Sequence, residues 1–143
     1  MAQLPLDLDD LSRRLVKQEA SGSLDPTAAA TGMETVCRRL RDDLKDILGS
    51  GGVFALMRRA LTLAMREHPL LVGVAVDTGP MACFTGLAEA LAAGTDEEAA
   101  AAAAAVLAHL LGLLVTLLGE ELGLQPVRKF WPHVALSVRE IDE

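Results

Sequence analysis

The residues from Thr95 to Gly123 limit the fold more than any other part of this chain. They are typical of one long helix, with no formal charge between positions 99 and 119. Thr95 and Glu98 have the spacing of a capping box, and Gly123 suits a helix C-terminus. A broad apolar face follows from Leu107, Leu110, Leu111, Leu114, Leu117, Leu118 and Leu122. Such a helix must be enclosed by other helices or by lipid, which makes it the expected centre of an all-α bundle.

The uncharged stretch 99–119 is long enough to cross a bilayer core of about 30 Å. Its first third is alanine, which inserts into membranes less readily than leucine, and acidic residues flank both of its ends. His109 lies near its middle, and Arg128 and Lys129 alone supply a weak positive flank. We therefore expect a buried central helix and no membrane span.

Four further helices are predicted from apolar residues at three- and four-residue spacing and from flanking Gly and Pro. They cover residues 4–20, 33–49, 53–68 and 81–93, the last with a start after Thr85 as the alternative. Thr31 and Glu34 have capping-box spacing, so residues 21–32 are expected to form a loop. One more short helix is expected at 126–131, before Pro132. The chain is read as one domain of four or five helices, 1–143, with a C-terminal tail at 133–143.

Two short segments have the alternation of strands, 70–76 and 133–138. They could pair as a two-stranded ribbon, or 70–76 could be a buried extended segment. Because an isolated ribbon is only marginally stable, at most a minor sheet is expected beside the helices.

Composition favours self-association. Hydrophobic residues make up 51% of the chain and aromatic residues only 3%, which is more apolar surface than a small monomer readily covers. A net charge of −7 argues against nucleic acid and anionic lipid as partners. Cys37 and Cys83 lie at apolar helix positions, as expected of buried free thiols in a reducing cytoplasm. No signal peptide precedes the first helix, so a cytoplasmic location is expected.

Four residues of the long helix, His109, Gly112, Thr116 and Gly119, recur at three- and four-residue steps and share one face. Their small side chains would leave a groove along the helix. Close packing against another helix, within the subunit or across a dimer axis, is the favoured interpretation. A ligand pocket with His109 as its polar anchor is the alternative.

Six arginines form a basic zone on two consecutive predicted helices: Arg38, Arg39, Arg41, Arg58, Arg59 and Arg66. Nearby acidic residues could balance them as a solvated surface, or Arg58, Arg59 and Arg66 could contact an acidic protein partner. Trp131, beside Phe130, either plugs the end of the bundle or anchors an interface.

Motifs for catalysis or metal binding are not found. The turn Ser50-Gly51-Gly52 lacks the spacing and the lysine of a phosphate-binding loop, and the three histidines have no metal-ligand spacing. Adjacent acidic pairs such as Glu120-Glu121 point about 100° apart on a helix. We therefore expect no enzyme, no cofactor and no metal.

The run Leu110 to Glu120, containing Gly-Leu-Leu-Val-Thr and Gly-Glu, is followed by Val127-Arg128 and Trp131-Pro132. This pattern resembles the C-terminal part of small uncharacterised bacterial helical proteins, over residues 51–132 at most. The resemblance implies a bacterial cytoplasmic protein and carries over no site. The expected function is a homodimeric, non-catalytic protein–protein interaction or regulatory module. A helical carrier or sensor, binding an apolar small molecule along the helix 96–122, is the alternative.

Overall fold

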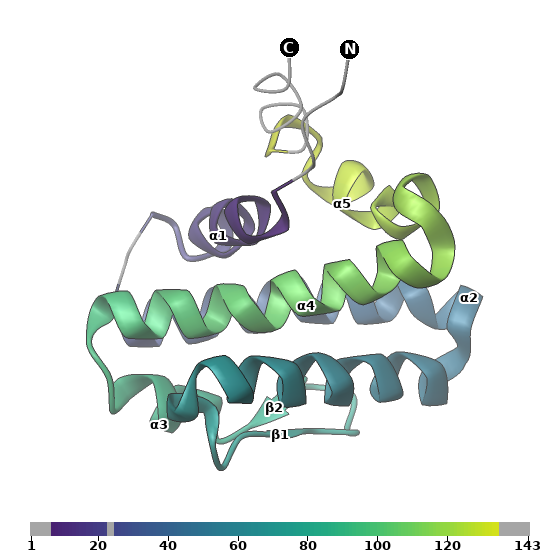
Figure 1. Ribbon diagram of the computed structural model, residues 1–143. Helices are drawn as coiled ribbons and strands as arrows, with labels where there is room; N and C mark the ends of the chain where they lie inside the picture. Colours follow the sequence, from purple (N-terminus) through teal and green to yellow (C-terminus); the bar gives the residue numbers. More distant parts are fainter. Residues whose placement is uncertain (1–6, 23–24, 135–143) are drawn as a thin grey trace.

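The computed structural model describes residues 7–22 and 25–134, and this part of the chain is mainly helical (Figure 1). In chain order the elements are α1 (Leu8–Glu19), α2 (Pro26–Glu67), the 3-10 turn η1 (Pro69–Leu71), β1 (Ala75–Val76), β2 (Phe84–Thr85), α3 (Leu87–Ala92), α4 (Asp96–Gly123) and α5 (Gln125–Phe130). The expected all-α class with at most a minor ribbon is confirmed.

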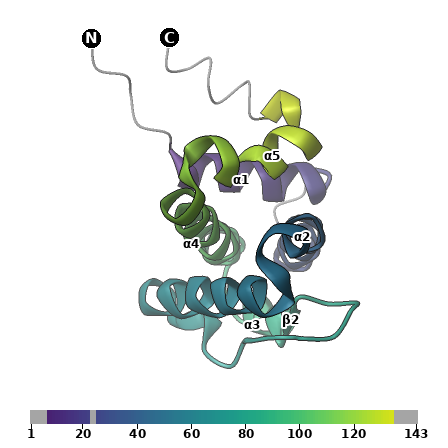
Figure 2. The same cartoon turned by 90° about the vertical axis from the view of Figure 1, so that its right-hand side faces the viewer.

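The central helix is α4, which packs against α1 and α2 (Figures 1 and 2). Its capping box is formed: Thr95 Oγ1 accepts a hydrogen bond from the Glu98 amide at 3.1 Å, and Glu98 Oε1 accepts one from the Thr95 amide at 2.8 Å. The interior face is made of small and large apolar residues in turn: Ala102, Ala103, Leu107, Leu110, Leu111 and Leu114 are all buried. The alanines allow α4 to lie close to its neighbours, and the leucines fill the core.

Both long helices break at a glycine. Gly49 in α2 has φ 74° and ψ 160°, and Gly119 in α4 has φ 86° and ψ 163°. The break expected at Ser50–Gly52 therefore occurs one residue earlier, at Gly49. The expectation of an uninterrupted helix to Gly123 is wrong, because Gly119 takes a backbone conformation that other residues reach only at a cost. Figures 1 and 2 show the two breaks at the same end of the molecule.

The loop expected at 21–32 is also wrong from residue 26 onward. Asp25 caps α2 by accepting a hydrogen bond from the Ala28 amide at 2.8 Å, and Pro26 occupies the first turn. Proline is favoured at this position, and alanines follow it with high helix propensity. The Thr31–Glu34 capping box does not form, since Thr31 lies within α2 and donates to the Thr27 carbonyl.

The small sheet is confirmed as a feature, but its expected pairing is wrong. β1 pairs antiparallel with β2, with Ala75 opposite Thr85 and Val76 opposite Phe84. Residues 133–138, the expected partner, begin next to α5, and 135–138 lie outside the described residues. α3 begins at Leu87, the later of the two predicted starts, after Gly86 with φ 77°.

Helix α1 lies across α4 and the first half of α2 (Figures 1 and 2). Gly32 allows this contact, because a Cβ atom added there would lie 2.5 Å from the Val16 carbonyl oxygen. The short helix expected at 126–131 is confirmed as α5, and it closes the bundle beside α1. Lys129 of α5 pairs with Asp43 of α2 at 2.8 Å.

Candidate functional site

The predicted groove residues lie on the outward side of α4, where each has a different environment. His109 Nε2 lies 2.9 Å from Glu67 Oε1, at the end of α2. A Cβ atom at Gly112 would lie 3.7 Å from Leu8 Cδ1 of α1. Thr116 is exposed and donates to the Gly112 carbonyl at 2.9 Å. Gly119 is exposed too, and a Cβ atom added there would have no neighbouring atom within 4 Å. The contacts at His109 and Gly112 are those of packing within the subunit.

Three surface cavities of about 540, 330 and 690 Å³ lie elsewhere on the molecule. The first is lined by α1 and the residues after α5, the second by α2, β2 and α3, and the third by the start of α2 and Ala92. None of the three is lined by His109, Gly112, Thr116 or Gly119. These cavities therefore give no support to a ligand pocket on the outward side of α4.

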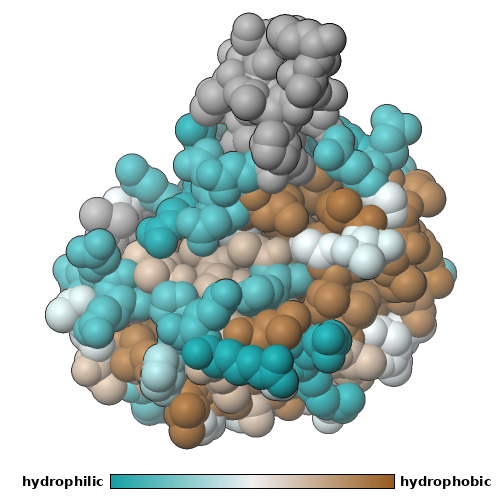
Figure 3. All heavy atoms as spheres, in the orientation of Figure 1, coloured by the Kyte–Doolittle hydropathy of each residue, from teal (hydrophilic) through white to brown (hydrophobic). Residues whose placement is uncertain are grey.

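Large apolar side chains are exposed where α2 and α4 break. Ile47 is 56% exposed, Leu117 58% and Leu122 54%, and the half-buried Leu48 and Leu118 lie beside them in sequence. We call these five residues the apolar end. Figure 3 shows hydrophobic residues gathered over this end of the molecule, at the right of the view. The apolar end is the largest departure from the predicted core, which had placed Leu117, Leu118 and Leu122 on the buried face.

The break at Gly119 explains the exposure of Leu122, which follows it. Helical periodicity assigns Leu122 to the same face as Leu111 and Leu114 only while the helix stays straight. After Gly119 the chain turns back, and a Cβ atom at Gly123 would lie 2.8 Å from the Leu114 carbonyl oxygen. The turn covers the main chain of α4 and directs Leu122 toward solvent.

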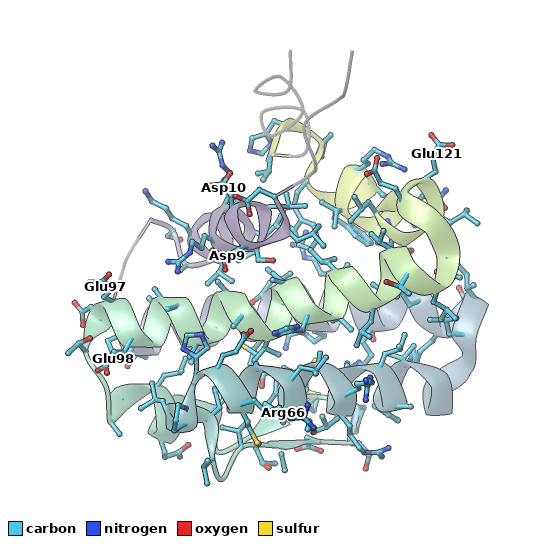
Figure 4. All side chains as sticks on the ribbon, viewed as in Figure 1. Asp9, Asp10, Arg66, Glu97, Glu98 and Glu121 are labelled. Atoms are coloured by element: carbon cyan, nitrogen blue, oxygen red, sulfur yellow. The ribbon has the colours of Figure 1, made fainter. Side chains whose placement is uncertain are left out.

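The second half of α2 carries three exposed arginines, Arg58, Arg59 and Arg66. Their side chains form no ion pair or hydrogen bond with any residue that the structure describes. Arg59 and Arg66 are seven residues apart, so they share one side of the helix, and Figure 4 shows Arg66 extending from it. All three arginines are therefore exposed, and their contact with an acidic partner stays a prediction.

Trp131 is not a surface residue, since only 2% of it is exposed. Its Nε1 donates to Glu19 Oε2 of α1 at 2.8 Å, and the Arg39 guanidinium lies 5.8 Å from its ring centre. Phe130 contacts it edge to face, with ring centres 5.8 Å apart. Trp131 therefore joins α5 to α1 and α2 as a plug, and its proposed role as an interface anchor is not supported.

A second feature, which the sequence did not predict, is a segment held against α2 by polar side chains. We call residues 77–83 the strap. The Arg41 side chain is 4% exposed and donates to the carbonyls of Gly79, Pro80 and Ala82 at 3.4, 3.0 and 3.3 Å. Three neutral carbonyl acceptors, with Asp42 at 3.1 Å, compensate the burial of its charge.

Other α2 side chains hold the rest of the strap. The Glu34 carboxylate accepts from the amides of Cys83 and Phe84 at 2.8 and 2.9 Å, and Arg38 donates to the Met81 carbonyl at 3.3 Å. Glu34, Arg38 and Arg41 follow helical spacing along one side of α2. No local signal in the sequence indicated that these side chains hold a segment some 40 to 50 residues away.

The two cysteines are buried free thiols, as predicted. Burial raises the pKa of the Cys37 thiol well above its usual value, and the neighbouring Cys83 and Glu34 raise it further. Burial likewise raises the pKa of Cys83 to about 12, although the Arg41 charge acts in the opposite direction. Both thiols are therefore protonated at neutral pH and are poor nucleophiles in the folded protein.

Within residues 7–22 and 25–134, no group of three or more His, Cys, Asp or Glu side chains is placed to hold a metal ion. Two helices, α2 and α4, are long and apolar enough to cross a bilayer, with 28% and 50% of their apolar windows buried in the protein. Core helices of soluble proteins meet the same criteria, so the expectation of a protein outside the membrane stays a prediction.

Comparison of the chain with protein-family models, with curated proteins and with solved structures finds no match.

Proposed function

We propose that this chain is a non-catalytic protein–protein interaction module of the bacterial cytoplasm that forms a homodimer through its apolar end. The observation that carries the proposal is the grouping of Ile47, Leu117 and Leu122, each more than half exposed, at the two helix breaks. Contiguous apolar surface of this kind is typical of interfaces.

A second copy is the simplest occupant of this surface. A two-fold axis brings the same patch of both copies together, so each exposed leucine is buried in both subunits of the dimer. Complete burial of a leucine contributes about 1.5–3 kcal/mol, and about half of that surface is still available here. Leu117 and Leu122 together therefore contribute about 4 kcal/mol to a symmetric dimer.

A regulatory role would use the other exposed group, the arginines at positions 58, 59 and 66. Unpaired arginines that share a helix attract carboxylates, so an acidic segment of another protein is the partner we propose for the dimer. The carrier alternative is not favoured, since Gly112 packs near Leu8 and the three cavities lie elsewhere.

Sedimentation velocity over a wide range of protein concentrations, without detergent, tests the homodimer. We expect a monomer–dimer equilibrium, and we expect the double variant Leu117→Gln, Leu122→Gln to weaken it by roughly 1,000-fold. The matched control is Val72→Gln, because Val72 is 70% exposed and follows η1, at the far end of α2 from Gly49.

The control variant should dimerise like the unmodified chain. A strictly monomeric wild-type protein at high concentration would exclude the homodimer. Equal weakening by Val72→Gln and by the double variant would show that general surface hydrophobicity, and not the apolar end, drives association.

A further inference from the structure

The strap holds Cys83 beside the part of α2 that carries Cys37. The Cys83 amide is bound by Glu34, and the carbonyl of the preceding Ala82 is bound by Arg41. Glu34 and Arg41 are seven residues apart on α2, and Cys37 lies between them, one turn from each. The main chain on both sides of Cys83 is therefore fixed to the helical turns that flank Cys37.

Both cysteine side chains belong to the buried core. Cys37 is 1% exposed and Cys83 is 0% exposed, and both belong to the same cluster of buried apolar residues. Burial raises the pKa of the Cys37 thiol most, and a further increase comes from the charge that Cys83 would carry. Because the interaction of two charges weakens with distance, this coupling fits two thiols that lie near each other. Main-chain hydrogen bonds place Cys83 beside the helical turns that flank Cys37, and the electrostatic coupling agrees with this placement.

We propose that Cys37 and Cys83 are a dithiol that closes to an intramolecular disulfide and fastens the strap to α2. This inference goes beyond the proposed interaction function. The oxidant is a low-molecular-weight disulfide of the glutathione class. One cysteine thiolate attacks it, forms a mixed disulfide and releases the first thiol; the second cysteine thiolate then attacks its partner's sulfur and releases the second thiol. Two protein thiols and one small disulfide become one protein disulfide and two small thiols.

Access to the pair is controlled by the strap. Neutral buried thiols exchange slowly, so the folded protein should react only when the strap detaches from Glu34 and Arg41. The disulfide, once formed, is shielded from reductants by the same burial. The expected behaviour is a slow cross-link that persists, in contrast to a rapidly responding exposed thiol.

The test is incubation of the full chain with buffers of oxidised and reduced glutathione, followed by intact mass measurement after all remaining thiols are alkylated in denaturant. We expect a monomer that has lost two hydrogen atoms and takes up no alkylating agent, with Cys37 and Cys83 joined in the peptide map. The closed loop from residue 37 to residue 83 should raise the Tm on the order of 10 °C, and reduction should reverse the increase.

Two variants sharpen the result. Cys83→Ser should show no rise in Tm on oxidation, and Arg41→Lys, which weakens the strap, should oxidise several-fold faster than the unmodified chain. The proposal is overturned if both thiols are alkylated after prolonged oxidation, if each carries a glutathione adduct, or if the disulfide joins two chains. These readings use the unmodified protein, so they hold even where a variant fails to fold.

Discussion

The close crossing of α1 and α2 at Gly32 allows a sharp test by replacing Gly32 with Ala. A methyl group there would lie 2.5 Å from the Val16 carbonyl oxygen and 3.2 Å from the Ala20 amide nitrogen. Ordinary contact begins near 3.4 Å, so α1 would have to move by about 1 Å at this point. Because the obstacle is main chain, a change of side-chain rotamer cannot remove it.

Two opposing effects set the magnitude. Overpacking a well-filled contact costs about 1–3 kcal/mol, and a main-chain obstacle places this variant at the upper end. Alanine inside a helix gains up to about 1 kcal/mol over glycine. The expected net loss in the free energy of unfolding is therefore about 2 kcal/mol, or a Tm lower by about 4–8 °C in a chain of this size.

Gly51→Ala is the matched control, because Gly51 lies in the same helix, is exposed and has no atom within 4 Å of the added methyl group. It should increase the free energy of unfolding by about 0.5–1 kcal/mol. Urea unfolding followed by circular dichroism measures both. If Gly32→Ala is as stable as Gly51→Ala, the two helices do not cross as closely as described, and the reasoning fails.

Three further outcomes are expected. Arg41→Met should lower the free energy of unfolding by about 2–4 kcal/mol in urea unfolding, because three strap carbonyls lose their donor. Arg41→Lys should recover only part of this loss. An Arg41→Met variant as stable as the unmodified chain would contradict the role of Arg41 in holding the strap. Burial raises the pKa of Cys83 to about 12, so the unfolded chain releases this proton first. The free energy of unfolding due to the protonated thiol is therefore complete below about pH 8.5 and is lost as the pH rises toward 12. The measurement is the difference in free energy of unfolding between the unmodified chain and Cys83→Ala at each pH, and a difference that does not change with pH would refute the expectation. Gly119→Ala should cost about 1 kcal/mol in thermal unfolding, because φ at this residue is 86°, and an unchanged Tm would show that α4 straightens without penalty.

The parts of the fold that the sequence predicts are those with local signals. The local signals are the capping box at Thr95 and Glu98, the amphipathic pattern from Met33 to Leu48 and Pro132 after α5, and each acts within a few residues. The start of α2 also had a local signal, Asp25-Pro26, but the small and polar residues that follow suggested a loop. The high helix propensity of three alanines decided the outcome.

The remaining features depend on contacts between distant residues. A glycine in the sequence does not reveal its own role. Gly32 is helical and allows α1 to lie close to α2, whereas Gly119 breaks α4. Periodicity assumes a straight helix, so it placed Leu122 in the core. The three arginines at 58, 59 and 66 are exposed as predicted, but Arg41, from the same basic zone, is buried by a strap that only the tertiary structure reveals.

The two glycine breaks also constrain how this chain can change in length. Segments 26–48 and 96–118 contain the same number of residues and end just before Gly49 and Gly119 respectively. The two helices lie side by side in Figure 2. At a rise of 1.5 Å per residue each segment is about 34 Å long. Removing one turn from a single segment would place its glycine about 5 Å short of the other and move the following residues out of register. An insertion or deletion in one helix should therefore be tolerated only with a matching change in the other. The two breaks thus require both helices to keep the same length.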